Sequence, residues 1–215
     1  KTEISTSLHH IGHVCIFQGN FNKSIENFKS SIKISEELDD KTGISTCLNH
    51  LGEVHRMLGN YKKSIDYHHQ SLKIFDEFAL MPDKASKRYG ERGKSASFHN
   101  IGIIYEIQGN HEKAMDCYFR SLKIDEAMNN KPGIAASMES IGGINYLLGN
   151  YPKAFEYYHK SLKIRKEIGD KYGIARSLGN IGNIYFEQEN YEKVIEYDLQ
   201  SFEIFQKLEI GRAHV

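Results

Sequence analysis

The sequence predicts an all-α protein built from five copies of a helical hairpin that stack side by side. An apolar residue followed by glycine recurs at spacings of 40, 50, 40 and 40 residues; the glycines are Gly12, Gly52, Gly102, Gly142 and Gly182. A Gly-Asn step, Glu-Asn in the fifth copy, begins seven residues after each glycine. A serine followed by an apolar residue comes nineteen residues after each glycine. Five copies in one register indicate a repeat protein.

Each copy has the pattern of two helices. In the second copy, apolar residues within 44–58 and again within 61–75 fall at helical spacing. We expect Gly59 to end the first helix in a left-handed conformation and Asn60 to cap the second. The connections are short and polar, which favours antiparallel neighbours. One hairpin cannot bury both its faces, so stacking the copies completes the core.

The glycine in the middle of each first helix requires an explanation, because it costs about 1 kcal/mol relative to alanine. Twelve residues later, the second helix carries a small residue in most copies, and this pairing predicts that the two helices of a hairpin approach closely. The residues are Ser24, Ser64, Ala114, Ala154 and Val194.

These patterns divide the chain into repeats at 1–40, 41–78, 93–130, 131–170 and 171–208, a basic loop inserted at 79–92, and a tail at 209–215. We expect the inserted loop to be a solvated connector; the alternative is a basic contact for a partner or a regulatory site. It would expose Met81, Pro82, Lys84, Lys87, Arg88, Tyr89 and Arg92.

Both ends of the chain suggest a fragment of a longer protein. Residues 1–6 match residues 41–46, so the chain begins at a repeat boundary, and no polar capping helix follows the last repeat. The closing Glu-Ile-Gly-Arg-Ala-His-Val resembles the translation of a sequencing adapter. We therefore expect the tail to be disordered or artefactual.

The composition excludes several classes of protein. Lys plus Arg and Asp plus Glu each total 28, so zero net charge gives no reason to expect nucleic acid or a membrane as partner. Three separated cysteines form neither a disulfide framework nor a zinc ligand set, and they suit a reducing, cytoplasmic location. No apolar run is long enough to span a bilayer.

The stretch Gly90-Glu-Arg-Gly-Lys-Ser95 resembles a phosphate-binding P-loop. However, Arg88 stands where the motif needs its first glycine, and no strand precedes the segment. Gly93 aligns instead with the glycine that opens other repeats, such as Gly43. We predict an ordinary repeat start.

His9 and His13 lie four residues apart on one helix, which is metal-ligand spacing, and a third ligand could come from His50 or His99. Other copies hold Asn, Glu or Ile at the same positions, so we interpret these histidines as structural or groove-lining. No nucleophile with a supporting base is evident. We predict a non-enzymatic protein without metal or cofactor, and retain a metal-dependent hydrolase as an alternative.

The repeat resembles the tetratricopeptide repeat family, most clearly in the third copy. The residues that carry this resemblance are Phe98, Ile101, Gly102, Tyr105, Ala114 and Tyr118. The 40-residue period is similar to that of the longer-helix subclass found in polarity adaptors, kinesin light chains and bacterial signalling regulators. Departures occur at aromatic positions that hold Cys15, His55, Asn145, His68 and Asp198.

The resemblance implies a right-handed α-solenoid whose first helices line a concave groove. The positions that face this groove are then three residues before, one residue after and four residues after each repeat glycine. The five copies differ most in sequence at these positions. Neighbouring amides would bind a peptide backbone, and Arg56 and Arg176 a carboxylate. The candidate groove residues are His9, His13, Asn49, Glu53, Arg56, His99, Asn100, Glu106, Glu139, Tyr146, Arg176, Asn180, Asn183 and Phe186.

We therefore expect a scaffold that binds a peptide or protein segment in this groove. The alternative is a sensory segment of a larger signalling protein, such as a kinase, cyclase or transcription factor, that responds to a peptide or small ligand. Self-association through the uncapped ends of the array is a further expectation.

Overall fold

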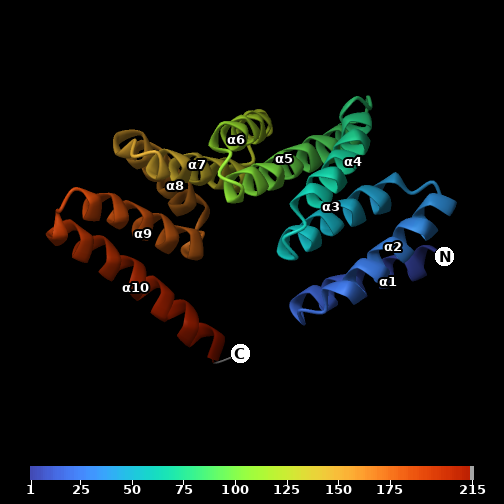
Figure 1. Cartoon of the computed structure of the whole chain (residues 1–215), viewed down its shortest axis with the longest axis horizontal. Helices are drawn as coiled ribbons and strands as arrows, with labels where there is room; N and C mark the ends of the chain where they lie inside the picture. The colour runs from blue at the N-terminus through green and yellow to red at the C-terminus, as the bar shows by residue number, and fades with distance from the viewer. Residues whose placement is uncertain (214–215) are drawn as a thin grey trace. The chain divides into compact units, whose positions relative to one another are not determined.

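The computed structural model of the chain describes residues 1–213, with side chains as far as Leu208. Within that range the chain forms ten α-helices and no strand (Figure 1). The helices are α1 (Thr2–Phe17), α2 (Phe21–Glu37), α3 (Lys41–Met57), α4 (Tyr61–Ala79), α5 (Lys84–Ile107), α6 (His111–Ala127), α7 (Lys131–Leu147), α8 (Tyr151–Ile168), α9 (Lys171–Glu187) and α10 (Tyr191–Ala213). The predicted all-α repeat fold is confirmed.

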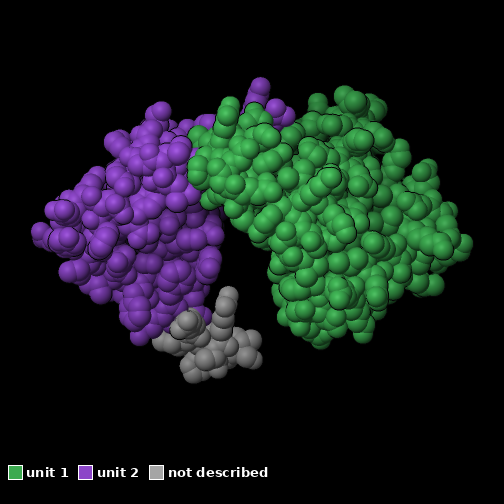
Figure 2. All heavy atoms as spheres, viewed as in Figure 1, with its two compact units in different colours: residues 1–117 green, residues 118–215 purple. Residues whose placement is uncertain are grey.

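The chain divides into two compact units, residues 1–117 and residues 118–215 (Figure 2). The boundary falls inside α6. In the first unit, Cys117 of α6 packs with Leu72 and Ile101. In the second, Tyr158 and Leu162 of α8 form a core with apolar residues of α9. Among the described residues, no helix has the length and apolar character needed to cross a membrane.

The mid-helix glycines allow two separate close contacts. A Cβ built on Gly12 would lie 2.7 Å from the ring of Phe28, so the glycine makes room for this fully buried side chain. The hydroxyl of Ser24 also donates a hydrogen bond of 2.9 Å to the carbonyl of Gly12. The small partner at position 24 is therefore only part of the reason, because the aromatic ring four residues later comes closest to the glycine.

The turn between α3 and α4 agrees with the sequence in one respect and differs in another. Gly59 has a φ of 72°, and the following Asn60 N–H donates to the carbonyl of His55 at 2.8 Å. Asn60 stands at the N-cap of α4, but its side chain makes no capping hydrogen bond. Its ψ of 60° lies outside the extended range that capping residues usually adopt, so the prediction of a side-chain cap is wrong.

The insertion at 79–92 is not a loop, which corrects that prediction. Helix α5 begins at Lys84, and the carboxylate of Asp83 accepts a hydrogen bond of 2.8 Å from the N–H of Ser86. The ring of Tyr89 packs edge-on against Phe75 and Phe78 of α4, with centroids 5.5 and 5.0 Å away. A capped start and an aromatic anchor make most of the insertion the first part of a 24-residue helix.

The P-loop-like stretch lies entirely within α5. A Cβ at Gly90 would overlap the backbone of α4 near Phe75 and Ala79, and a Cβ at Gly93 would overlap the ring of Phe75. Both glycines thus permit close packing of α5 on α4. This is helix packing and not a phosphate-binding loop, as the sequence indicated.

The last helix, α10, continues to Ala213. The separate tail expected at 209–215 lies outside the described residues, because side chains are described only as far as Leu208 and the backbone only as far as Ala213. Phe202 of α10 is 61 % exposed, whereas Leu162, at the same repeat position of α8, is 5 % exposed. The self-association expected from this apolar face stays a prediction.

Candidate functional site

All fourteen candidate groove residues lie on the first helices of the hairpins, but several bond to one another. Those in the first unit lie on α1, α3 and α5, and those in the second unit lie on α7 and α9.

A cluster of three histidines lies between α1 and α3. His9 and His13 face His50, and one ring nitrogen of each lies within 4.8 Å of the others. The two Nε2 atoms of His13 and His50 are 2.9 Å apart, so one donates a hydrogen bond to the other. The third ring is thus His50, the first of the two candidates that the sequence left open.

The environment of this cluster favours the neutral form of His9 and His13. Burial lowers the pKa of His9 to about 4, and the neighbouring histidines act in the same direction. Burial and His50 also lower the pKa of His13, although Glu53 opposes them. The contact with the His50 ring lowers the pKa of Glu53, which therefore stays ionised at neutral pH. Nδ1 of His50 is 3.9 Å from the Glu53 carboxylate.

Asn49, at the centre of the first unit, uses its carbonyl oxygen internally. This oxygen accepts hydrogen bonds from Nδ1 of His68 at 2.9 Å and from the hydroxyl of Ser97 at 3.2 Å. His68 is completely buried over Gly52, and burial lowers its pKa to about 4. What Asn49 can offer a ligand is its amide nitrogen.

A pocket of about 830 Å³ opens between α3 and α5. We call it the α3–α5 pocket; its lining residues are Thr46, Asn49, His50, Phe75, Ala85, Arg88, Tyr89, Arg92 and Gly93. The hydroxyl of Tyr89 is fixed by hydrogen bonds of 2.9 Å to Ser45 and 3.2 Å to Thr46. Two arginines, a histidine and an amide thus line one concave surface with an aromatic wall.

The same repeat positions form a much smaller pocket one hairpin earlier. Between α1 and α3 the pocket measures about 220 Å³, and Thr6, His9 and Gly43 line it where Thr46, Asn49 and Gly93 line the larger one. The difference comes from the insertion, because Ala85, Arg88 and Tyr89 extend the wall of the larger pocket and have no counterpart in the smaller one. The sequence identified these basic residues but did not place them beside Asn49 and His50.

The remaining first-unit candidates on α3 and α5 are not among the residues that line this pocket. Arg56 and Glu53 are half-buried on α3. His99, Asn100 and Glu106 are half-buried on α5.

In the second unit, three candidates join a buried ionic network instead of an open groove. Glu139 of α7 is only 8 % exposed, and its carboxylate pairs with Arg165 of α8 and Arg176 of α9. The amide of Asn180 donates to the same carboxylate at 3.4 Å. Arg165 also pairs with Asp170. The carboxylate that we expected Arg176 to take from a ligand is supplied by the protein itself.

The sequence did not identify Arg165 as part of this site. The copies differ at its position, which holds Ser35, Phe75, Asp125, Arg165 and Phe205. This variation was a signal that the position carries special contacts.

The other second-unit candidates are more accessible. The hydroxyls of Tyr146 and Tyr151 both donate to the carboxylate of Glu187, at 3.0 and 3.1 Å. Phe186 is 57 % exposed, and Asn183 is exposed as well.

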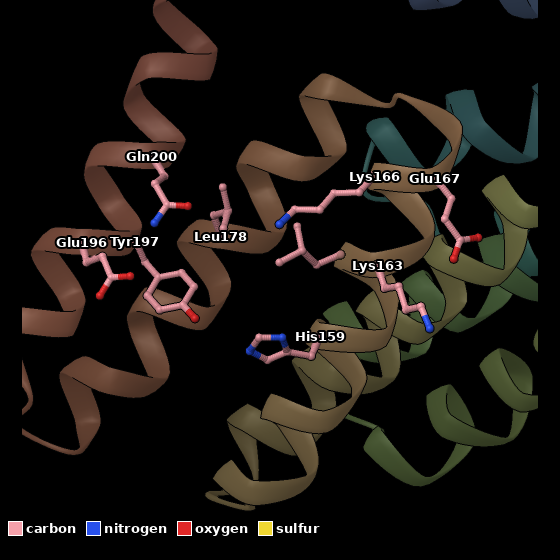
Figure 3. A pocket seen from close by; sticks show the side chains of 9 residues that line it. His159, Lys163, Lys166, Glu167, Leu178, Glu196, Tyr197 and Gln200 are labelled. Carbon is pink, nitrogen blue, oxygen red and sulfur yellow. The ribbon is translucent and has the colours of Figure 1, made fainter.

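A groove of about 510 Å³ lies on the second-helix side of the same unit, between α8 and α10 (Figure 3). Tyr197 and Gln200 of α10 face His159 and Lys166 of α8 across it, with Leu178 of α9 between them (Figure 3). A groove of about 420 Å³ recurs at equivalent residues of α2, α3 and α4. Its recurrence indicates that hairpin stacking itself produces this groove, so it is a weaker site candidate than the α3–α5 pocket.

Three solved structures illustrate the likeness of the fold. BtubC (BKLC) from P. vanneervenii has 15 % identity and a TM-score of 0.79, covering 97 % of this chain and 82 % of that one. A Signal Transduction ATPase with Numerous Domains (STAND) protein with a tetratricopeptide repeat sensor, from Pyrococcus horikoshii, has 20 % identity and a TM-score of 0.78; the match covers 97 % of this chain and 30 % of that one. A Rap protein complexed with Competence and Sporulation Factor has 21 % identity and a TM-score of 0.74; the match covers 93 % of this chain and 54 % of that one.

At these identities the structures show the fold alone. No match was found among curated protein sequences. Two family models, both described as tetratricopeptide repeat, match the sequence: one at residues 3–77 and 133–207, the other at residues 95–127. The chain therefore belongs to the tetratricopeptide repeat family.

Proposed function

We propose that the protein binds an acidic peptide or protein segment in the α3–α5 pocket and acts as an interaction scaffold without chemistry of its own. The observation that carries this proposal is the enlargement of the pocket to about 830 Å³ by a helical insertion that also adds Arg88 and Arg92. Tetratricopeptide repeats generally mediate protein–protein interaction, and the pocket supports a role of this kind for this chain.

The charge of the pocket selects the ligand. Arg88 and Arg92 are exposed guanidinium groups four residues apart on one face of α5, and planar guanidinium groups bind carboxylates through paired hydrogen bonds. The amide nitrogen of Asn49 adds a donor from α3. A C-terminal carboxylate or an Asp or Glu side chain suits this set of groups.

The shape of the pocket suits a short segment of a partner. Its volume lies within the range of about 300–1,000 Å³ typical of ligand pockets, which is room for a few side chains. The rings of Phe75 and Tyr89 supply apolar surface beside the charged groups. Tyr89 is held on both sides, so the pocket is largely preformed, and less entropy is lost on binding.

The names of two structural relatives are consistent with recognition and sensing. One solved Rap protein is complexed with Competence and Sporulation Factor, and one STAND protein has a tetratricopeptide repeat sensor. The chain spans 30 % of that STAND protein. We therefore keep a sensory segment of a larger signalling protein as the second candidate function; ligand binding in the pocket would be its input.

A peptide selection on the purified chain tests the proposal. We expect displayed random peptides selected on the wild type to converge on sequences with a carboxylate at a fixed position. The double variant Arg88→Glu/Arg92→Glu should weaken binding of those peptides by at least about tenfold, because attraction becomes repulsion. Fluorescence anisotropy with labelled peptides measures the affinities.

The matched control is Lys163→Glu/Lys166→Glu, which changes the charge equally in the groove between α8 and α10. Its peptide affinity should equal that of the wild type. An equal loss in both double variants would mean that net charge, and not the pocket, attracts the peptide. Selected peptides without an acidic group would also overturn the proposal.

A further inference from the structure

We propose that His9, His13 and His50 form a binding site for a divalent transition-metal ion of the zinc class. The site lies between α1 and α3, within the first unit. It does not depend on the proposed peptide binding, because the ligands are the three imidazole rings themselves.

The positions of the rings are close to those that a metal ion needs. His9 and His13 stand one helical turn apart on α1, so their side chains project from the same face. The Nε2 atoms of His13 and His50 are 2.9 Å apart, and nitrogens bound tetrahedrally to one zinc ion are about 3.3 Å apart. The three ligand nitrogens lie within 4.8 Å of one another, so small rotations of partly exposed rings bring them to one centre.

One ring nitrogen in the cluster also lacks a partner. Nε2 of His9 is buried and makes no hydrogen bond among the described residues. A buried polar atom without a partner is costly and uncommon, and a bound ion is one established explanation. A metal ion would satisfy this nitrogen and replace the single hydrogen bond between His13 and His50.

The surroundings hold the rings in place. The fully buried ring of Phe28 stacks on the ring of His50, with the two ring centroids 5.4 Å apart. The centroids of the His9 and His13 rings lie 5.7 and 6.0 Å from that of Phe28. His50 directs Nε2 toward His13 and Nδ1 toward the carboxylate of Glu53, at 3.9 Å. Metal-bound histidines usually donate their other N–H to such a carboxylate, so Glu53 lies on the correct side and needs to approach by about 1 Å.

The ligand set determines the class of metal. Three imidazole nitrogens suit zinc, copper or nickel, whereas calcium and magnesium prefer oxygen ligands. Three protein ligands on zinc leave a fourth position open. His50 lines the α3–α5 pocket and His9 lines the smaller pocket between α1 and α3, so a solvent molecule or a ligand atom could reach that position.

Calorimetric titration of the full chain with zinc ions alone tests this inference. We expect one ion per chain with a Kd of about 1 μM or tighter. His13→Gln and His50→Gln should each weaken binding by more than tenfold, and Glu53→Gln by about tenfold. With cobalt as the probe, the wild type should show visible absorption of a tetrahedral site. Zinc should raise the Tm of the wild type but not that of His13→Gln.

The matched control is His10→Gln, which removes an exposed histidine of the same helix that is not one of the proposed ligands. Its zinc affinity should equal that of the wild type. The inference is overturned if the wild type shows no saturable binding, or if His13→Gln binds as tightly as His10→Gln. Circular dichroism establishes that each variant is folded, so a lost site can be distinguished from a lost fold.

Discussion

The first helices of successive hairpins meet at two comparable interfaces, which we call the α1–α3 junction and the α7–α9 junction. The two junctions occupy the same repeat positions but carry different kinds of side chain. His9 and Glu139 both stand three residues before the repeat glycine, and His50 and Asn180 both stand two residues before the next one. The first junction holds a cluster of histidines, whereas the second holds a buried ionic network. The stacking of the hairpins therefore does not require a particular chemistry at these positions.

What stays constant between the two junctions is packing. A Cβ on Gly12 would meet Phe28, and a Cβ on Gly142 would meet Tyr158, in each case less than 3 Å from the ring. The aromatic ring and the glycine fix the distance between the helices. The side chains at the junction can then pair with one another, as around Glu139, or present ring nitrogens and a pocket, as around His50.

The largest expected effect comes from Glu139→Ala. The side chain of Arg165 is 8 % exposed, and the change removes one of its two carboxylate partners. Removing one member of a buried ion pair typically costs about 3–5 kcal/mol, because the remaining charge stays desolvated. We expect this loss in the free energy of unfolding, measured with chemical denaturant.

His9→Ala is the matched change at the equivalent position of the first junction. His9 is only partly buried and carries no ion pair, so we expect a loss of less than about 1 kcal/mol. Equal costs at the two sites would show that the position, and not its chemistry, determines stability.

The second prediction is that acid destabilises the two units over different pH ranges. His68 is buried and its pKa is lowered from 6.5 to about 4, so the unfolded chain takes up the proton first. Its stabilising contribution is complete above pH 6.5 and falls by roughly 3 kcal/mol as the pH drops to 4. His9, whose pKa is also about 4, acts with the same sign. The first unit should therefore loosen between pH 6.5 and 4.

The second unit should respond mainly at lower pH. The N–H of Gly173 and the charge of Arg165 lower the pKa of Asp170 below 3.8, so its contribution is lost only as the pH falls through that lower value. His159 adds a weaker loss with the sign of His68, because its ring is only partly buried. Hydrogen exchange followed by mass spectrometry at pH 7, 5 and 4 (roughly the window set by histidine) compares the units.

His68→Phe is the control for this experiment. Phenylalanine already stands at the equivalent position of the first repeat, Phe28, so the ring should fit over Gly52. The variant should lose the part of the pH dependence of the first unit that comes from His68 and keep the part that comes from His9. If protection against exchange, relative to the intrinsic rate at each pH, falls in the variant as steeply as in the wild type, His68 is not the responsible group.

The sequence was sufficient to predict the helices and their stacking, because apolar spacing and the repeat glycines are local signals. It misjudged the insertion, although Asp83 followed by Ser86 three residues later was a capping signal in the sequence. The sequence was not sufficient to predict which side chains pair with one another. Nothing in the repeat register shows that Arg176 contacts Glu139, because residues on one inner row can face either a ligand or one another.

The smallest expected effect tests whether the difference in stability between the two junctions comes from charge in general or from buried charge in particular. Exposed ion pairs recur at one repeat position in both units: Lys41 to Glu77 at 2.6 Å, and Lys131 to Glu167 at 3.0 Å. Solvent screens such pairs, so Lys41→Ala and Lys131→Ala should leave the Tm unchanged within error, at low salt and at about 1 M salt. The Glu139 network differs from them in the burial of Glu139 and Arg165 and in having more than one partner for each. A loss comparable to that of Glu139→Ala would therefore mean that the surface pairs join the hairpins, and that the contrast between the two junctions is not what determines their stability.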